Sequence, residues 1–105
     1  MKLIHDLKLK DGSAVFPVGT ECEVAFFGSD SPFSTLAKVT INSREIKVRC
    51  RNLPHYFARF KKPSLKKLER WSWDSVCESM LGERVEPDGY DHHGAPSWLL
   101  ALGMI

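Results

Sequence analysis

The sequence predicts a single small α+β domain that is dominated by antiparallel strands. Three segments of its first half alternate between apolar and polar residues, which is typical of strands with one buried face. Turn signals rich in glycine, serine and proline separate these segments. A serine-capped helical pattern follows near residue 64. With 105 residues, of which 43% are hydrophobic and 27% charged, the chain is long enough for one compact core.

Four strands are predicted in the first half of the chain. Residues 7–9 form a short strand, which is followed by a turn at Asp11-Gly12 and a loop that reaches Gly19. The other three strands are residues 21–27, 37–41 and 45–51. A two-residue hairpin turn at Asn42-Ser43 joins the last two of them. Alternation is clearest in the last strand, where basic side chains face away from the apolar ones.

A short helix and a hairpin are predicted next. Ser64 is the expected N-cap of the helix, and Leu68 lies on its apolar face. The helix ends before a turn at residues 72–75. Residues 76–79 and 84–86 then flank a glycine-containing turn as the two strands of a hairpin.

The last stretch of the sequence is a polar turn followed by an apolar segment. Full burial of each large apolar side chain contributes roughly 1.5–3 kcal/mol, so we expect residues 96–105 to pack into the core. Pro96 suits the first turn of a helix and Gly103 suits its end, which predicts a helix over residues 96–102. The domain thus comprises residues 1–62 and residues 63–105, packed as a single folding unit.

Residues 8–57 combine three meandering strands, a short strand before them, a Gly19-Thr20 entry into the second strand and a turn at residues 54–57. In strand count and length this region resembles an SH3-like barrel. The resemblance implies a small, strongly bent β-barrel within residues 1–62. A small orthogonal sandwich of the same strands is the alternative.

The second half contains the motifs Val85-Glu86-Pro87-Asp88-Gly89 and Pro96-Ser97-Trp98-Leu99-Leu100-Ala101-Leu102-Gly103, with Asp91 and Gly94 between them. Over roughly the last 40 residues, the chain resembles small uncharacterised proteins that are encoded by phages and other mobile elements. The resemblance implies an accessory protein of a mobile element. It brings no catalytic residue and no cofactor to this chain.

Charge is unevenly distributed along the chain, whose net charge is +2. Residues 1–43 have four basic and five acidic residues, a net charge of −1. Residues 44–70 have ten basic and two acidic residues, a net charge of +8, and residues 71–105 have one basic and six acidic residues, a net charge of −5. We call residues 44–70 the basic segment.

The basic segment is the first candidate site. Its candidate contacts to a partner or a nucleic acid are Lys47, Arg49, Arg51, Arg59, Lys61, Lys62, Lys66, Lys67 and Arg70. Basic groups neutralise phosphates, and the interleaved aromatic residues Tyr56, Phe57 and Phe60 would stack on unpaired bases. The favoured alternative is a charged sheet face that keeps the domain soluble and forms salt bridges with Glu21 and Glu23. In that case the acidic second half folds over the helix, and the aromatic residues belong to the core.

A second candidate site consists of Asp88, Asp91, His92 and His93. Two carboxylates and two imidazoles within six positions can ligate a divalent metal that activates water, as in a metal-dependent hydrolase. The favoured interpretation is a tight turn, in which Asp91 accepts hydrogen bonds from backbone amides. No metal or other cofactor is therefore expected.

The tryptophans are a third candidate. Trp71 and Trp98 are expected in the core, and Trp73 is expected on the surface, where an aromatic side chain can anchor an interface. The leading hypothesis is therefore a non-enzymatic binding module that contacts another protein or associates with itself. Nucleic-acid binding through residues 44–70 is the alternative, and a metal-dependent hydrolase is the third hypothesis.

Other features bear on the compartment. Cys22, Cys50 and Cys77 are odd in number and lack CxxC spacing, so we expect reduced core residues and no disulfide or zinc knuckle. No apolar run approaches the roughly 20 residues of a membrane span. The first residues do not form a secretory signal. These observations predict a cytoplasmic protein without membrane contact.

Overall fold

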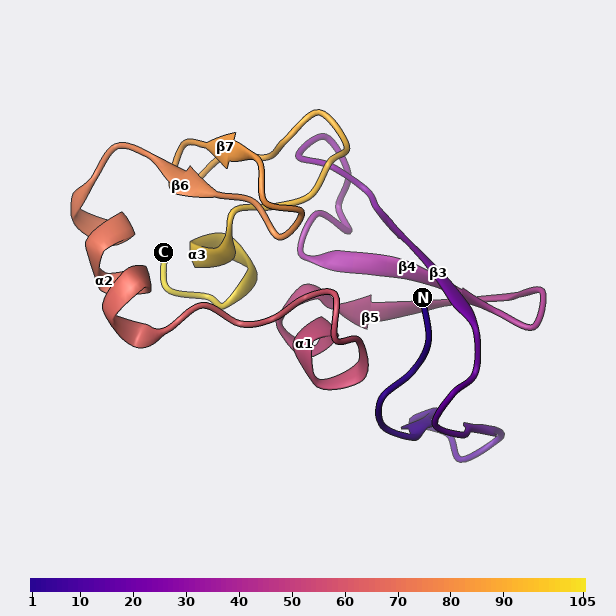
Figure 1. The fold of residues 1–105 in the computed structure, drawn as a ribbon. Helices are drawn as coiled ribbons and strands as arrows, with labels where there is room; N and C mark the ends of the chain where they lie inside the picture. Colours follow the sequence, from indigo (N-terminus) through magenta and orange to yellow (C-terminus); the bar gives the residue numbers. More distant parts are fainter.

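The computed structural model describes residues 1–105 and contains mostly strands in antiparallel sheets, with a few short helices (Figure 1). The strands are β1 (Leu7–Lys8), β2 (Val15–Phe16), β3 (Cys22–Phe26), β4 (Leu36–Ile41), β5 (Arg44–Arg49), β6 (Cys77–Glu78) and β7 (Arg84–Val85). The helical elements are the 3-10 helix η1 (Cys50–Asn52) and the α-helices α1 (Leu53–Tyr56), α2 (Leu65–Trp73) and α3 (Trp98–Ala101). The predicted α+β class is confirmed.

The central sheet has the strand order β3-β4-β5. Ile41 pairs with Arg44, and the two residues between them, Asn42 and Ser43, have φ values of 51° and 66°. Two consecutive positive φ values match the twist of the flanking strands, which makes this the favoured two-residue hairpin turn. The predicted turn at Asn42-Ser43 is confirmed. On β4, Ala37, Val39 and Ile41 are fully buried, as their alternation predicts.

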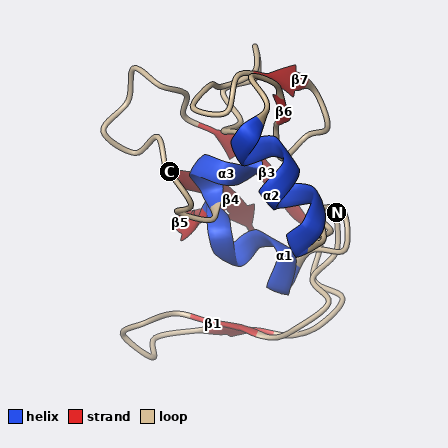
Figure 2. Ribbon diagram, turned by 90° about the vertical axis from the view of Figure 1, so that its left-hand side faces the viewer, coloured by secondary structure: helices blue, strands red, loops and turns tan.

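The strands form three separate sheets, and no closed barrel is found. Strands β1 and β2 form their own hairpin, which projects from one end of the molecule (Figure 2). Residues 1–62 thus contain a three-stranded meander and a projecting hairpin. Strand β2 lies in a region that was predicted to be a loop. That prediction followed from the turn composition of Phe16-Pro17, but the Phe16 side chain is buried and its residue pairs with β1. The predicted strand over residues 45–51 ends at Arg49, where the chain enters η1.

Helix α2 begins as predicted. The Ser64 hydroxyl accepts a hydrogen bond from the Lys67 backbone N–H at 3.3 Å, and Leu68 and Trp71 are buried. The helix continues through Trp73, so the predicted turn over residues 72–75 begins two residues too early. The Ser72 hydroxyl donates to the Glu69 carbonyl at 2.6 Å, which satisfies a turn-favouring side chain inside a helix.

The C-terminal helix is shorter than predicted. Ser97, rather than Pro96, marks its start, because the Ser97 hydroxyl caps α3 by accepting from the Leu100 N–H at 3.1 Å. Gly103 has φ +71° and ends the helix as predicted. The Met104 N–H donates to the Leu99 carbonyl at 2.9 Å, which completes a Schellman motif.

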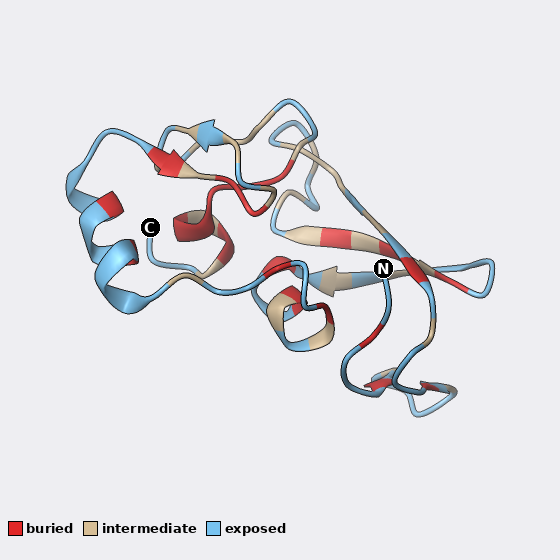
Figure 3. Ribbon diagram, in the orientation of Figure 1, coloured by how far each residue is buried: buried red, intermediate tan, exposed pale blue.

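Burial is continuous across both parts of the chain (Figure 3). One core cluster contains Leu3 and Leu7 from the first residues and Trp98 and Leu99 from α3. The expected docking of the C-terminal stretch holds as far as Ala101, whereas Ile105 is 57% exposed. The predicted hairpin after α2 is confirmed as β6 and β7. None of the helices is long and apolar enough to cross a bilayer.

Candidate nucleic-acid interface

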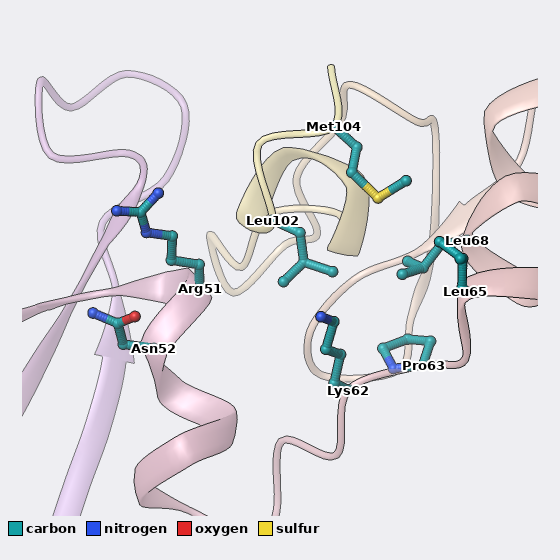
Figure 4. Close-up of a pocket in the computed structure, with 8 residues that line it drawn as sticks. All are labelled: Arg51, Asn52, Lys62, Pro63, Leu65, Leu68, Leu102 and Met104. Carbon is teal, nitrogen blue, oxygen red and sulfur yellow. The ribbon is translucent and has the colours of Figure 1, made fainter.

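Three hollows adjoin one another where β5 passes into η1. One lies against the β1–β2 hairpin and is lined by Lys8, Lys10, Lys47 and Arg49, among others. The next shares Arg49 with it and adds Arg51. The third, of about 560 Å³, shares Arg51 with the second and extends to Lys62 beside α2 (Figure 4). We call this continuous surface the basic groove and define it by Lys8, Lys10, Lys47, Arg49, Arg51 and Lys62.

Local geometry explains why these side chains converge. β5 is an edge strand, and its alternation turns Lys47 and Arg49 to the exposed face. The 3-10 turn that follows places Arg51 on the same surface, although it is no longer on the strand. In Figure 4, Lys62 points towards Leu102, and Arg51 lies at the edge of the third hollow with its guanidinium directed away from the other lining residues. The groove therefore combines basic residues from three parts of the chain.

Few acidic groups lie near the basic groove: Lys47 also lines a separate hollow with Glu45, whose carboxylate pairs with Lys38 at 3.7 Å. No acidic residue lines any of the three hollows, and none of the six basic residues takes part in an ion pair. Glu21, which was considered as a partner for the sheet face, instead binds the amino group of Met1 at 2.8 Å. Of the basic residues predicted as contacts, Lys67 is the one paired with the acidic second half, through Glu78 at 3.6 Å. The positive field of the groove is thus exposed to solvent.

The floor of the groove is apolar. The third hollow has Leu65, Leu68, Leu102 and Met104 among its lining residues (Figure 4). The first hollow includes the half-buried Tyr56, whose ring is the aromatic group on this surface. The other two aromatic residues predicted to stack on bases, Phe57 and Phe60, are fully buried and pack against each other with ring centroids 6.4 Å apart. Those two residues are therefore core, as the competing interpretation held.

The remaining basic candidates lie outside the groove. Arg59 donates to the Leu81 carbonyl at 3.3 Å and lies over the Phe60 ring. Lys66 and Arg70 are exposed on α2, and the helical repeat of 3.6 residues puts them on the face opposite Leu65 and Leu68. Lys61 is exposed next to Lys62 but lines no hollow.

Sequence reasoning missed two groove residues, Lys8 and Lys10. They belong to a segment whose net charge is negative, so counting charges along the chain gave no reason to select them. Lys8 ends β1 and Lys10 lies in the turn that follows, so strand alternation does not place both on one face. Their place beside Lys47 follows from the path of the β1–β2 hairpin in space.

Cys50 lies between the two groove arginines and is fully buried. Burial raises the pKa of its thiol to about 12. Because the thiolate is the reactive form of cysteine, Cys50 contributes packing rather than a nucleophile at this position. The groove offers cations, amides and apolar surface, which are the groups of a binding site.

The second candidate site is not assembled as predicted. Both carboxylate oxygens of Asp91 are used within the fold: one accepts from the Ser79 hydroxyl at 2.7 Å, and the other accepts from the backbone N–H groups of His93 and Ala95. This is the tight turn of the favoured interpretation. Asp88 is exposed and takes part in no ion pair. The tryptophans lie as predicted, with Trp71 and Trp98 buried and Trp73 89% exposed.

Comparisons with known proteins identify no relative. No family model matches the chain, no curated protein is significantly similar to it, and no solved structure matches its fold. The resemblances to mobile-element proteins and to an SH3-like barrel stay predictions. Functional argument therefore rests on the geometry of the molecule itself.

Proposed function

We propose that the protein binds single-stranded nucleic acid in the basic groove. The observation that supports this is the set of six unpaired basic side chains around three adjoining hollows that no acidic residue lines. Basic side chains release the counterions condensed on phosphates, which favours association with a polyanion. The proposal places nucleic-acid binding ahead of protein contact, which is the reverse of the order favoured by sequence alone.

The shape of the groove favours a single strand over a duplex. A duplex keeps its bases stacked inside and presents phosphates on a convex surface, whereas a single strand can turn its bases onto an apolar floor. In this groove Lys62 lies beside leucine side chains, Arg51 lies at the edge of the same hollow, and Tyr56 supplies a ring for stacking. Stacking of a base on an aromatic side chain contributes about 1–3 kcal/mol and tolerates any base. We therefore expect weak sequence preference.

Equilibrium binding to a labelled single strand of about 12 nucleotides tests the proposal. Fluorescence anisotropy is measured for the wild type and for the double variant Arg49→Glu/Arg51→Glu, at low and at near-physiological salt. Contact with four phosphates gives a slope of log K against log salt of about −3, and loss of two of them makes the slope shallower by about 1.4. We expect the double variant to bind at least tenfold more weakly at low salt.

A matched control separates the groove from the net charge. The variant Lys66→Glu/Arg70→Glu changes the net charge by the same amount on the face of α2 that is turned away from the groove, so it should bind nearly as the wild type does. Equal losses in both double variants would indicate nonspecific attraction rather than a site. A flat titration of the wild type at low salt would refute the proposal, because electrostatic attraction is strongest there.

Protein contact is the second candidate function, and the exposure of Trp73 favours it. An exposed tryptophan is a common anchor of interfaces, and Trp73 is 89% exposed at the end of α2. On this proposal the chain is an accessory protein of a mobile element that binds another protein, or itself, through Trp73. If the chain self-associates through this residue, Trp73→Ala should shift the sedimentation coefficient towards that of the monomer at high concentration. If the wild type and Trp73→Ala are both monomeric, self-association is excluded as the function.

A further inference from the structure

Three potential metal ligands converge outside the basic groove. Glu83 lies in the turn between β6 and β7, and His92 and His93 lie in the turn that precedes α3. The His92 Nδ1 atom is 2.8 Å from Glu83 Oε2, and the His93 Nε2 atom is 3.7 Å from Glu83 Oε1. The ligand atoms of all three side chains lie within 4.8 Å of one another. This set keeps His92 and His93 of the predicted cluster and has Glu83 in place of Asp88 and Asp91.

The buried Ser79 and the half-buried Asp91 hold the two turns together. Ser79 is fully buried; its hydroxyl donates to Asp91 Oδ2 at 2.7 Å and accepts from the Glu83 backbone N–H at 3.1 Å. The other oxygen of Asp91 accepts from the His93 N–H at 2.8 Å. The backbones of Glu83 and His93 are therefore fixed through one Ser79–Asp91 hydrogen bond. These hydrogen bonds hold the two turns that carry the three ligands at a fixed separation.

The separations are close to those of a tetrahedral site. Donor atoms about 2.0–2.2 Å from a four-coordinate metal lie about 3.3–3.6 Å from one another. His92 Nδ1 and His93 Nε2 approach different oxygens of Glu83, at 2.8 and 3.7 Å, and single ligand atoms of the three residues lie within 4.8 Å of one another. Rotation of these side chains completes the site when an ion binds. Two imidazole nitrogens and one carboxylate oxygen form a donor set that suits Zn²⁺ and its first-row neighbours, whereas Mg²⁺ and Ca²⁺ prefer oxygen alone.

We propose that Glu83, His92 and His93 bind a divalent transition-metal ion that bridges the β6–β7 turn and the turn before α3. The side chains of His92 and His93 are 70% and 56% exposed, so water completes the coordination shell. None of the three residues lines the basic groove. The bound ion links two turns within the second half of the chain. Both imidazoles are within ion-pair distance of Glu83, so a metal titration is needed to distinguish an ion site from two ion pairs.

Titration of the metal-free protein with ZnCl₂ in an isothermal calorimeter tests the site. We expect one equivalent of Zn²⁺ to bind, with affinity reduced at least tenfold in His93→Ala and in Glu83→Gln. The control is His5→Ala/His55→Ala, which removes the other histidine pair, stacked with ring centroids 4.4 Å apart. That variant should bind as the wild type does. Because all four histidines are exposed, these replacements should leave the circular dichroism spectrum of the metal-free protein unchanged.

Co²⁺ provides an independent readout of the geometry. The intense visible absorption of four-coordinate Co²⁺ should appear with the wild type and disappear with His93→Ala. Absence of one-equivalent Zn²⁺ binding would overturn the proposal. Binding that survives in both His93→Ala and Glu83→Gln, or that is lost in His5→Ala/His55→Ala, would overturn it equally, because the ion would then be bound elsewhere.

Discussion

Ser79 is a small polar residue in a position that few polar residues occupy. Its hydroxyl is fully buried, donates to Asp91 and accepts from the backbone N–H groups of Leu81 and Glu83. Removal of this hydroxyl leaves one carboxylate oxygen and two backbone N–H groups without a hydrogen-bond partner, at a cost of about 1–3 kcal/mol. One hydroxyl therefore joins the β6–β7 turn to the turn before α3.

Replacement of Ser79 by alanine should lower the free energy of unfolding by about 1–3 kcal/mol. A change of 1 kcal/mol moves the melting temperature of a domain of this size by about 4–8 °C, so the loss is visible in a thermal scan. Ser72→Ala is the control, since the Ser72 hydroxyl is exposed and bonds within its own helix. Equal stability of Ser79→Ala and Ser72→Ala would contradict the role assigned to Ser79.

Cys50 gives the stability of the protein a predictable dependence on alkaline pH. Burial raises the pKa of its thiol from 9.0 to about 12, so the folded state holds the proton where the unfolded state loses it. The contribution is fully present below pH 9 and is lost as the pH rises towards 12. The midpoint of urea denaturation should therefore fall between pH 9 and pH 10.5 in the wild type, and fall less in Cys50→Ala. Parallel curves would contradict the assignment.

At the level of elements, two glycines lie close together where the two halves of the chain meet. Gly94, in the turn before α3, has φ +81°, and a Cβ atom there would lie 2.9 Å from the Gly28 nitrogen in the loop after β3. Gly82 has a similar φ of +87°, but nothing lies within 4 Å of its would-be Cβ. The two glycines thus share a left-handed backbone conformation, which glycine adopts without strain, and differ in packing.

Alanine replacements at Gly82 and Gly94 distinguish the cost of the left-handed backbone from the cost of the close contact. Gly82→Ala should cost about 1–2 kcal/mol for the left-handed backbone alone. Gly94→Ala should cost a further 1–3 kcal/mol or so, because the turn must move away from Gly28. Chemical denaturation of both variants measures the difference. Equal destabilisation would show that the turn can move away from Gly28 at little cost in free energy.

Local signals predicted the elements better than their assembly. The hairpin turn at Asn42-Ser43 and the cap at Ser64 depend on neighbouring residues, and both are present as predicted. The barrel depends on how distant strands meet, and strands as short as Leu7–Lys8 and Val15–Phe16 do not specify that from pattern alone. The helix start at Pro96 was misplaced because Ser97 is the stronger cap.

The candidate sites show the same division. Lys47 and Arg49 were predictable because alternation on one strand decides which way they face. Lys8 and Glu83 were not predicted, because each acquires its neighbours from another part of the chain. Charge counted along the sequence cannot show which basic residues share a surface, or that the acidic second half pairs with the basic segment only through Lys67.

At the scale of the whole molecule, two surfaces have distinct chemistry. The basic groove runs from the β1–β2 hairpin to α2 and the C-terminal segment, and Glu83, His92 and His93 lie in the turns of the second half. Their separation predicts independent behaviour. Saturation with Zn²⁺ should leave the affinity for a single-stranded oligonucleotide within about twofold of its metal-free value, since coupling energies require a shared two-state element. Anisotropy titrations with and without Zn²⁺ measure this, and a tenfold change would indicate that the two surfaces are linked.

A residue-resolved map of binding shows whether a nucleic acid occupies the basic groove. Backbone amide NMR spectra of the labelled protein are recorded while an unlabelled oligonucleotide is added. We expect the largest shifts at Lys8, Lys47, Arg49, Arg51 and Lys62, with Lys66 and Arg70 nearly unmoved. Shifts centred on Trp73, or no shifts at low salt, would contradict binding in the basic groove.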